Sequence, residues 1–358
     1  MAHIFKKPTK NNKGIIVYTH KELEKPRWKN LTGPLPILSD RIAEKYHIGM
    51  HYGSTPRHFS GLHPHVSFVM ASKNQVTLGD KNVLHIPMNS RNFLPAFFKP
   101  RDTPKYWDIL NVSRNHPHKH LDIFIHAVKA LYNKGLMYNV LLVVATEPHE
   151  LEHDSKWPKI VEMYEEMFSM KERDHFTLLR LSPEFSGQGL PMRTVAHLYN
   201  SSKVFSMICH AEGESRVIHE ALICGLPVVV FKHLQGGGRD FLNENNSVQF
   251  DTYERLPDAL HEAVQGYDTK LNFDKEKMMN LLGVEKTLED FEGYLKVLYR
   301  QNGQEYDTST PLINTDYLNL RLPSHYQEVP WYMADVYKYG ADIITVKQFK
   351  EFEKELDL

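Results

Sequence analysis

Two glutamates, Glu212 and Glu220, are separated by seven residues across the junction between an expected loop and an expected helix. The helix is predicted over 216–224, with Ser215 as its N-cap, and an apolar strand follows a Gly-x-Pro turn. A carboxylate accepts hydrogen bonds from vicinal hydroxyl groups, so two of them can hold opposite ends of one polar ligand. A sugar beside a nucleotide has that chemistry. The alternative for either glutamate alone is a solvated position on the helix surface.

Arg114 and Lys119 lie on a second segment, where a loop rich in histidine enters an expected helix. Two fixed cations beside a helix N-terminus favour binding of a diphosphate, because charge, dipole and N–H donors act together. Cations that merely face solvent at a helix start are the alternative. A third segment, 235–240, contains three consecutive glycines. Their N–H groups can approach an anion; the alternative is that the glycines only form a flexible loop.

The elements that position these segments alternate regularly from residue 106 onward. Apolar runs predict strands, and segments with helical periodicity separate them. Such alternation is typical of right-handed βαβ units and a doubly wound parallel sheet, whose ligands bind beyond the carboxyl ends of the strands. We expect strands over 108–112, 140–145, 176–181, 203–208 and 228–231, and helices over 119–132, 157–170, 195–200 and 216–224.

Three regions are expected along the chain. Residues 1–105 form a small N-terminal α/β domain, with a first strand over 14–18 and an irregular portion over 31–100, and 101–105 are a linker broken by proline. Residues 106–267 form the nucleotide-binding type of α/β domain. Residues 268–358 form a helical C-terminal extension, with continuous helix over 275–299.

Bulk properties exclude several classes of protein. The 358 residues suit two domains, and the net charge of −1 argues against nucleic acid as a main partner. No apolar run is long enough for a membrane span, and no secretory signal opens the chain. Cys209 and Cys224 lie in apolar surroundings, which favours buried thiols over a disulfide and therefore a cytoplasmic location.

The first thirty residues are more basic than the rest. We expect them to form a solvated surface arm, with weak peripheral docking to an anionic membrane as the alternative. The basic residues concerned are Lys6, Lys7, Lys10, Lys13, Lys21, Lys25, Arg27 and Lys29.

Taken together, these segments resemble the nucleotide-binding domain of retaining GT-B glycosyltransferases of family 4, the glycosyltransferase group 1 type. The likeness covers about 160 residues. It runs through Tyr106-Trp107-Asp108-Ile109-Leu110-Asn111-Val112-Ser113-Arg114, Lys119, His197-Leu198-Tyr199-Asn200-Ser201-Ser202-Lys203-Val204 and the Glu212 to Val229 motif; residues 85–93 also look like the family's hinge strand.

The resemblance implies a GT-B fold, with a Rossmann-like domain, and a role for each matching residue. Arg114 and Lys119 would bind the donor diphosphate and stabilise it as a leaving group, with neither a metal nor another cofactor. Glu220 would hold the ribose, and Glu212 would face the hydroxyl groups of the transferred hexose. The backbone amides that would approach the phosphate or sugar belong to Gly213, Glu214, Ser215 and Arg216.

The implied activity is transfer of a sugar from a nucleoside-diphosphate donor to a hydroxyl group of a glycan or lipid-linked acceptor. The short first domain, which lacks a Gly-Gly loop after its first strand, leaves two alternatives: a non-catalytic binding subunit and a nucleotide-sugar epimerase. His51, His63 and His65 are the candidates for a first-domain histidine near the sugar, and zinc bound by the alternating His116, His118 and His120 is a minor alternative. Donor base, oligomeric state and the role of the C-terminal extension stay open.

Overall fold

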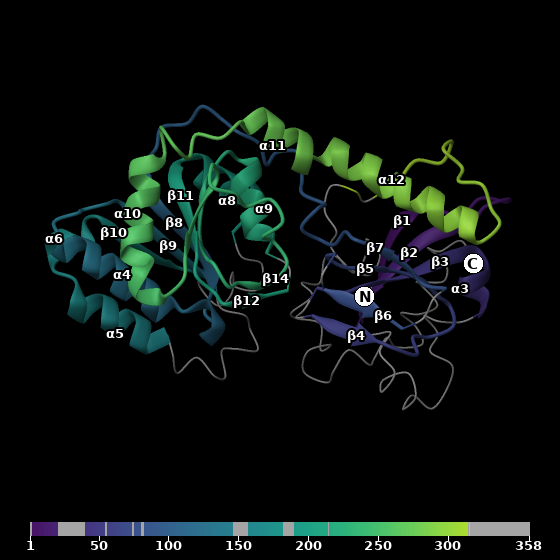
Figure 1. Ribbon diagram of the computed structural model, residues 1–358, viewed down its shortest axis with the longest axis horizontal. Helices are drawn as coiled ribbons and strands as arrows, with labels where there is room; N and C mark the ends of the chain where they lie inside the picture. Colours follow the sequence, from purple (N-terminus) through teal and green to yellow (C-terminus); the bar gives the residue numbers. More distant parts are fainter. Residues whose placement is uncertain are drawn as a thin grey trace. The chain divides into compact units, whose positions relative to one another are not determined.

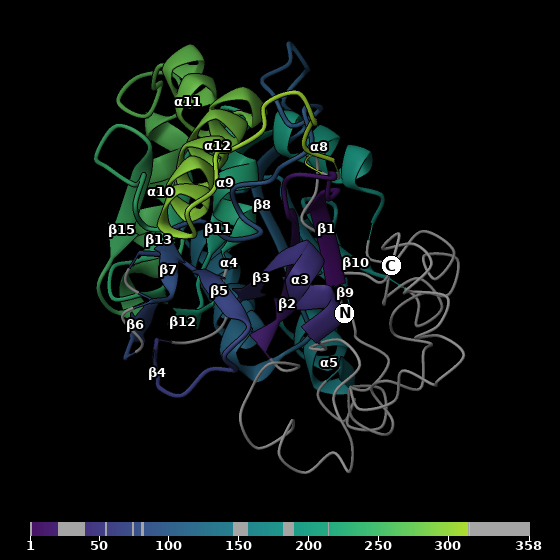
Figure 2. The same ribbon diagram turned by 90° about the vertical axis from the view of Figure 1, so that its right-hand side faces the viewer.

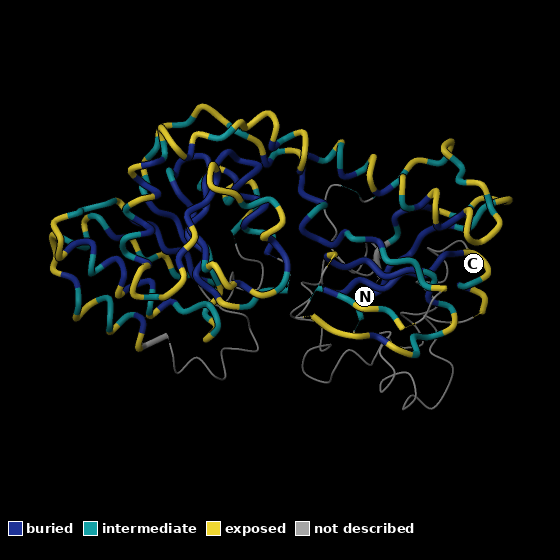
Figure 3. Tube along the Cα trace, viewed as in Figure 1, coloured by how far each residue is buried: buried dark blue, intermediate teal, exposed yellow. Residues whose placement is uncertain are grey.

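The computed structural model describes residues 2–20, 40–53, 56–73, 75–79, 82–145, 157–181, 190–213, 215–313 and 315. The chain forms two compact units. Unit 1 contains the residues up to Pro95 together with the described residues from Val284 onward, and unit 2 contains Ala96–Gly283. Both units are built around a sheet, and Figure 3 shows that the buried residues follow the strands of each.

The core of unit 2 is a six-stranded parallel sheet in the order β10-β9-β8-β11-β13-β15. Its strands are short and apolar, and β9 is buried along nearly its whole length, as expected for a parallel sheet covered on both faces. The strands are β8 (Trp107–Arg114), β9 (Val140–Ala145), β10 (Phe176–Arg180), β11 (Ser202–Met207), β13 (Val228–Phe231) and β15 (Ser247–Phe250).

Helices cover both faces of this sheet (Figure 1). The apolar sides of α4 and α10 pack into one core with β8, β9 and β15, whereas α8 and α9 contact each other and the sheet. The helices are α4 (Leu121–Asn133), α5 (Trp157–Met167), α6 (Met170–Arg173), α8 (Met192–Asn200), α9 (Arg216–Ile223), α10 (Leu256–Gly266) and α11 (Lys275–Leu282), with short 3-10 turns η2 (Pro117–Lys119) and η4 (Tyr253–Arg255). The predicted doubly wound α/β architecture is confirmed.

Several predicted helices have different bounds in the structure; α8, for example, begins at Met192 where a start at 195 was expected. The helix expected from 119 begins at Leu121, because Pro117 starts the separate turn η2. The helix expected over 157–170 ends at Met167, and Ser169 then caps α6 in a reciprocal arrangement with Glu172.

Unit 1 contains a regular sheet, so the expectation of an irregular N-terminal region is wrong. Its order is β1-β2-β3-β5-β7, parallel except for the antiparallel pair β1 and β2 (Figure 2). A second parallel pair joins β4 and β6. The elements are β1 (Ala2–Lys6), β2 (Gly14–Thr19), α3 (Asp40–Lys45), β3 (Tyr46–His51), β4 (Arg57–Phe59), β5 (Val66–Met70), β6 (Val76–Leu78) and β7 (Leu84–Ile86).

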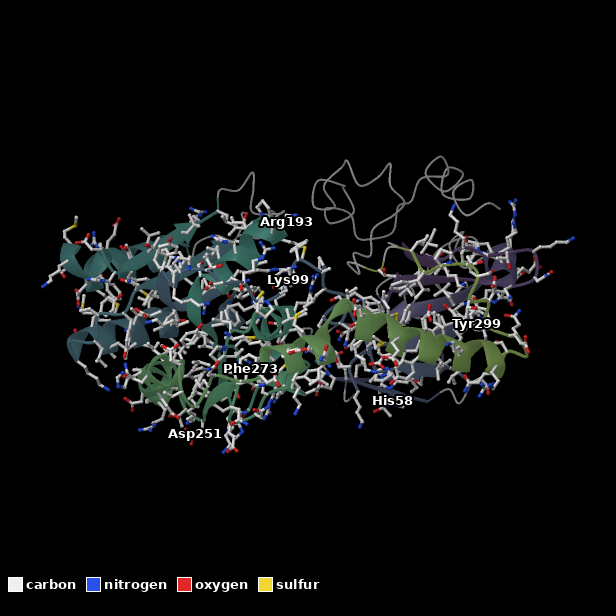
Figure 4. All side chains as sticks on the ribbon, turned by 90° about the horizontal axis from the view of Figure 1, so that it is seen from above. His58, Lys99, Arg193, Asp251, Phe273 and Tyr299 are labelled. Carbon is white, nitrogen blue, oxygen red and sulfur yellow. The ribbon has the colours of Figure 1, made fainter. Side chains whose placement is uncertain are left out.

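The last described helix, α12 (Val284–Gln301), completes the core of unit 1. Phe291 is fully buried there. The centroid of its ring lies 4.7 Å from that of Phe5 and 5.3 Å from that of Phe93. Tyr299, labelled in Figure 4, is also buried and donates a hydrogen bond to the carbonyl of Lys13. The helix expected over 275–299 is therefore two helices, separated at Gly283, and they belong to different units.

The segment 96–105 belongs to unit 2, not to the N-terminal region that was expected to end at 105. Asn200 explains this, because its side-chain amide donates to the carbonyl of Lys99 at 3.0 Å and accepts from the N–H of Arg101 at 2.6 Å. Arg193 of α8 also stacks over Phe97 at 4.7 Å; Figure 4 labels Arg193 and Lys99.

The expected basic surface arm is wrong for part of its residues. Lys6 is buried in unit 1, where its ammonium donates to the carbonyls of Asp307, at 2.7 Å, and Thr310. Lys13 donates to the carbonyl of Ala43. Lys7 and Lys10 are exposed, as expected, whereas Lys21, Lys25, Arg27 and Lys29 lie outside the described residues. Within the described ranges, every helix is too short or too polar to cross a bilayer.

Candidate active site

Four structural elements of unit 2 carry the predicted charged residues of the site, and one of them, the turn η2, ends at Lys119. Arg114 is the last residue of β8, which lies next to β11 in the sheet. Glu212 lies on β12 (Ala211–Glu212), a short strand that follows β11, and Glu220 lies on α9. These residues lie at, or soon after, the carboxyl ends of the central strands β8 and β11, which is where parallel α/β sheets bind ligands.

Lys119 and Glu212, which are far apart in the sequence, form an ion pair between the Lys119 ammonium and Glu212 Oε2. Both side chains are mostly buried, with relative exposures of 16% and 22%. His118 Nε2 lies 3.8 Å from the same oxygen, and the Cys209 thiol donates to it at 3.8 Å. The structure therefore joins the predicted phosphate segment directly to the first predicted glutamate.

These neighbours determine the charge of Glu212. Burial by itself raises the pKa of this carboxyl group, but the adjacent His118 and Lys119 lower it, and the resulting pKa is about 2. Burial raises the pKa of the Cys209 thiol to about 12. Glu212 is thus a carboxylate, and Cys209 a neutral thiol, at any physiological pH.

Glu220 has the opposite environment, although it belongs to the same motif. It is buried on α9, where the Tyr199 hydroxyl donates to its Oε2 at 3.1 Å and Arg216 Nη2 lies 3.7 Å from its Oε1. Burial raises the pKa of Glu220, and the hydrogen bond from Tyr199 and the charge of Arg216 only partly oppose that effect. The pKa values of the two glutamates are therefore shifted in opposite directions, downward for Glu212 and upward for Glu220.

The glycine-rich segment packs directly against the glutamate motif. Strand β14 (Gln235–Gly236) pairs in parallel with β12, so that Gly236 faces Glu212. A Cβ on Gly236, whose φ is +95°, would lie 1.7 Å from the Glu212 carbonyl oxygen, and one on Gly238, with φ +107°, 2.4 Å from Ser215 Cβ. Close backbone approach, rather than flexibility, is the reason for glycine at these two positions.

The amides predicted to approach the donor lie around the start of α9. Gly213 accepts a hydrogen bond from Gly237 N–H at 3.4 Å, and Glu214 lies outside the described residues. Ser215 occupies the N-cap position, but its side chain does not cap the helix. Its buried Oγ has no hydrogen-bond partner among the residues that the structure describes.

The candidate histidines of the first domain are on unit 1. His51 is buried at the end of β3, and His63 and His65 contact each other with ring centroids 4.8 Å apart. His65 also lies 2.9 Å from Asp40. Which of the three approaches a donor sugar stays a prediction.

Several residues of the site were not singled out from the sequence. Tyr199 contacts Glu220 although 20 residues separate them along the chain, and His210 bonds to His120 across 90 positions. The only signals were that Tyr199 belonged to the segment resembling the family and that histidines were abundant. In the described ranges, no group of three or more His, Cys, Asp or Glu side chains is placed to hold a metal ion. Both cysteines are free and buried, as expected.

The fold and the position of the site define a class of protein: a two-unit α/β protein of the GT-B type, with a doubly wound parallel sheet in the unit that carries the motif. Residues 95–277 match the family described as glycosyl transferases group 1. The match covers just over half of the chain, and the chain belongs to this family. No curated protein matches the chain.

Solved structures show the same fold at low sequence identity. TarM is similar with a TM-score of 0.51 and 15% identity, over 71% of this chain and 51% of that chain. HepE from Anabaena, in complex with UDP, is similar with a TM-score of 0.51 and 15% identity, over 70% of this chain and 72% of that one. This chain thus spans about half the length of TarM.

Proposed function

We propose that this protein is a retaining glycosyltransferase of family 4, which transfers a hexose from a nucleoside-diphosphate sugar to a hydroxyl group of a glycan or lipid-linked acceptor. The observation that carries the proposal is the Lys119–Glu212 ion pair beside the carboxyl ends of β8 and β11. A cation held at that edge can meet a donor diphosphate, and the carboxylate that holds it can meet the sugar hydroxyls.

The reaction demands stabilisation of a departing diphosphate and of a sugar that acquires positive charge. Arg114 and Lys119 would neutralise the leaving group, in place of a metal ion. Glu212, which is ionised because its pKa is about 2, would accept hydrogen bonds from sugar hydroxyls and favour the cationic sugar. Positioning and electrostatics, with no covalent nucleophile, then account for the rate.

Glu220 would hold the ribose of the donor. Its carboxyl group is anchored by Tyr199 and Arg216, so its orientation is set by the protein before a ligand arrives. A buried carboxyl group of this kind discriminates strongly against a ligand that lacks the matching hydroxyl. Without that hydroxyl, the acceptor positions of Glu220 that face the ligand would stay unpaired.

UDP is the nucleotide to test first. TarM from S. aureus and HepE from Anabaena were both solved in complex with UDP. Thermal unfolding of this protein should shift upward with one family among UDP, GDP and ADP and their sugar conjugates, by an amount that grows with ligand concentration.

Two lysine variants make the test specific to the site. Lys119→Ala should abolish most of the shift, whereas Lys270→Ala should keep it, since Lys270 pairs with Glu262 on the exposed surface of the same unit. Arg114→Ala should reduce the shift more than Lys119→Ala if the guanidinium contacts the diphosphate through two hydrogen bonds. No shift with any nucleotide would contradict the proposal and favour a non-catalytic binding subunit.

A further inference from the structure

His120 has a left-handed backbone conformation, which is uncommon for residues other than glycine. Its φ is 50° and its ψ 45°, and among the described residues it is the only non-glycine with positive φ. Side chains carry a steric cost in this left-handed region, and glycine avoids it. The presence of histidine at this position, directly before α4, indicates that its imidazole makes an interaction that compensates for the strain.

The imidazole of His120 connects two segments that are far apart in the chain. Its Nε2 lies 2.9 Å from Nδ1 of His210, and the two ring centroids are 5.2 Å apart. On another side its ring lies 5.0 Å from the ring of Tyr253. One neutral imidazole can donate and the other accept, so a single hydrogen bond bridges the η2 turn and the loop after β11.

Each end of this bridge adjoins one partner of the Lys119–Glu212 ion pair. Lys119 immediately precedes His120, and Glu212 follows His210 by two residues. The backbone supports both ends, since Lys119 N–H donates to the carbonyl of His116 at 2.9 Å and Gln235 N–H to that of His210 at 2.8 Å. The bridge therefore spans the same gap as the ion pair.

We propose that His120 is a positioning residue for donor binding: its hydrogen bond to His210 fixes the spacing of the Lys119 and Glu212 segments. This inference rests on the proposed function, because the ligand in question is the nucleoside diphosphate of the donor. Without the bridge, the ammonium and the carboxylate sample a wider range of separations, and binding must then order them.

The bridge depends on pH, because it requires at least one neutral imidazole. Burial lowers the pKa of His120, and the nearby His210 and His118 lower it further, while Asp122 opposes them. Tyr253 contributes a neutral ring at this site. His120 is therefore neutral at pH 7 and can be protonated only as the pH falls. When both rings are protonated, both nitrogens carry a proton and the bond is lost.

Replacement by glycine separates the imidazole from the backbone. His120→Gly retains the left-handed conformation without strain, so its melting temperature should equal or exceed that of the parent. Its affinity for UDP, measured by calorimetry at pH 7.5, should nevertheless fall by about three- to tenfold, the effect of one net hydrogen bond. His120→Gln should restore part of the affinity, since the glutamine amide reaches about as far as Nε2 of histidine and can bond to His210.

Two further measurements distinguish positioning from a general structural effect. His210→Ala should reproduce the loss, and the double variant His120→Gly/His210→Ala should add little to it, because both changes remove one bond. Between pH 7.5 and 4.5 the UDP affinity of the parent should fall more steeply than that of His120→Gly, because the lowered pKa of His120 delays the loss of the bond to the acid end of this range. Protonation of UDP itself is common to both proteins and cancels in the comparison.

The outcomes separate this inference from the proposed function. If the parent binds no nucleotide, the proposed function is wrong. If the parent binds UDP and His120→Gly binds it equally at both pH values, the positioning role is wrong while the proposed function stands. Unfolding of His120→Gly, or additive losses in the double variant, would also overturn the positioning role.

Discussion

At the scale of single residues, the site places two carboxyl groups of one motif in opposite environments. Glu212 is flanked by His118 and Lys119, which hold its pKa at about 2, whereas Glu220 is enclosed by α9 and Tyr199, and burial raises its pKa. Pairs of carboxyl groups whose environments separate their pKa values commonly have different functions within one site.

Glu212→Gln should impair turnover more than binding, because the lost charge acts on the sugar as it becomes cationic. We expect the rate of UDP release from a UDP-sugar to fall by about 100-fold or more, with the UDP dissociation constant changed by less than about threefold. Glu262→Gln is the matched control, since Glu262 pairs with Lys270 on the surface. Equal losses in binding and turnover would assign Glu212 to ground-state binding instead.

Glu220→Gln should stabilise the protein while it weakens the donor site. A carboxyl group with a raised pKa favours folding below its unfolded pKa, and that contribution is lost as the pH rises through its folded pKa. The glutamine, which stays neutral, should therefore raise the melting temperature at pH 7 by about 2–4 °C, the shift that 1 kcal/mol produces in a domain of this size. The gain should shrink at pH 4.5, and UDP affinity should fall at pH 7.

The identity of the site residues was predictable from the sequence, but their partners were not. Glu212, Glu220, Arg114 and Lys119 stand in motifs with recognisable types and spacing. The pairing of Lys119 with Glu212 depends on the adjacency of β8 and β11, which nothing local encodes. The bond between His120 and His210 depends in addition on the left-handed backbone at His120.

At the scale of elements, the pairing of β12 with β14 makes the glycine segment part of the site. Gly236→Ala should lower the free energy of unfolding by about 3 kcal/mol or more, because its Cβ would collide with the Glu212 carbonyl and its φ is positive. Nucleotide binding should weaken as well, because displacement of β12 also moves the amides of Gly213 to Arg216, which we propose approach the donor. Chemical denaturation and UDP titration measure the two effects.

Gly135→Ala is the control for this substitution. Gly135 also has positive φ, +76°, but a Cβ there would meet no atom within 4 Å. This variant should lose only about 1–2 kcal/mol, the cost of the left-handed backbone, and should bind UDP like the parent. If both variants lost the same stability and kept UDP binding, close approach at Gly236 would not matter to the site.

The sequence predicted the elements best where they were apolar and bounded by turns. Strand β13 has the expected bounds, and β9 likewise, because continuous β-branched and leucine residues admit few alternatives. The strand pairing of unit 1 was missed because β7 of the five-stranded sheet and both strands of the separate pair, β4 and β6, have only three residues each. Their pairing comes from tertiary contacts, which short patterns do not specify.

At the scale of the whole molecule, the amphipathic pattern of α12 was visible, but not the core that it joins. Phe291→Ala should therefore destabilise unit 1 selectively, by about 3–5 kcal/mol, because the side chain fills the space between Phe5 and Phe93. Differential scanning calorimetry should show one transition lowered by this variant and a second one raised by UDP.

Lys296→Ala, on the exposed side of the same helix, is the matched control and should change neither transition by more than about 0.5 kcal/mol. A single transition that responds equally to Phe291→Ala and to UDP would show that the two units unfold together, not separately.

The division of unit 1 between both ends of the described chain also has a consequence for biosynthesis. Ala96–Gly283 is continuous, so all of unit 2 can leave the ribosome before α12 has emerged. Strands β1 to β7 emerge first, yet Phe5 and Phe93 stay without their neighbour Phe291 until nearly two hundred further residues have been added. The first-made sheet is therefore the last to be completed, and during that interval it is the part of the nascent chain that most needs protection by chaperones.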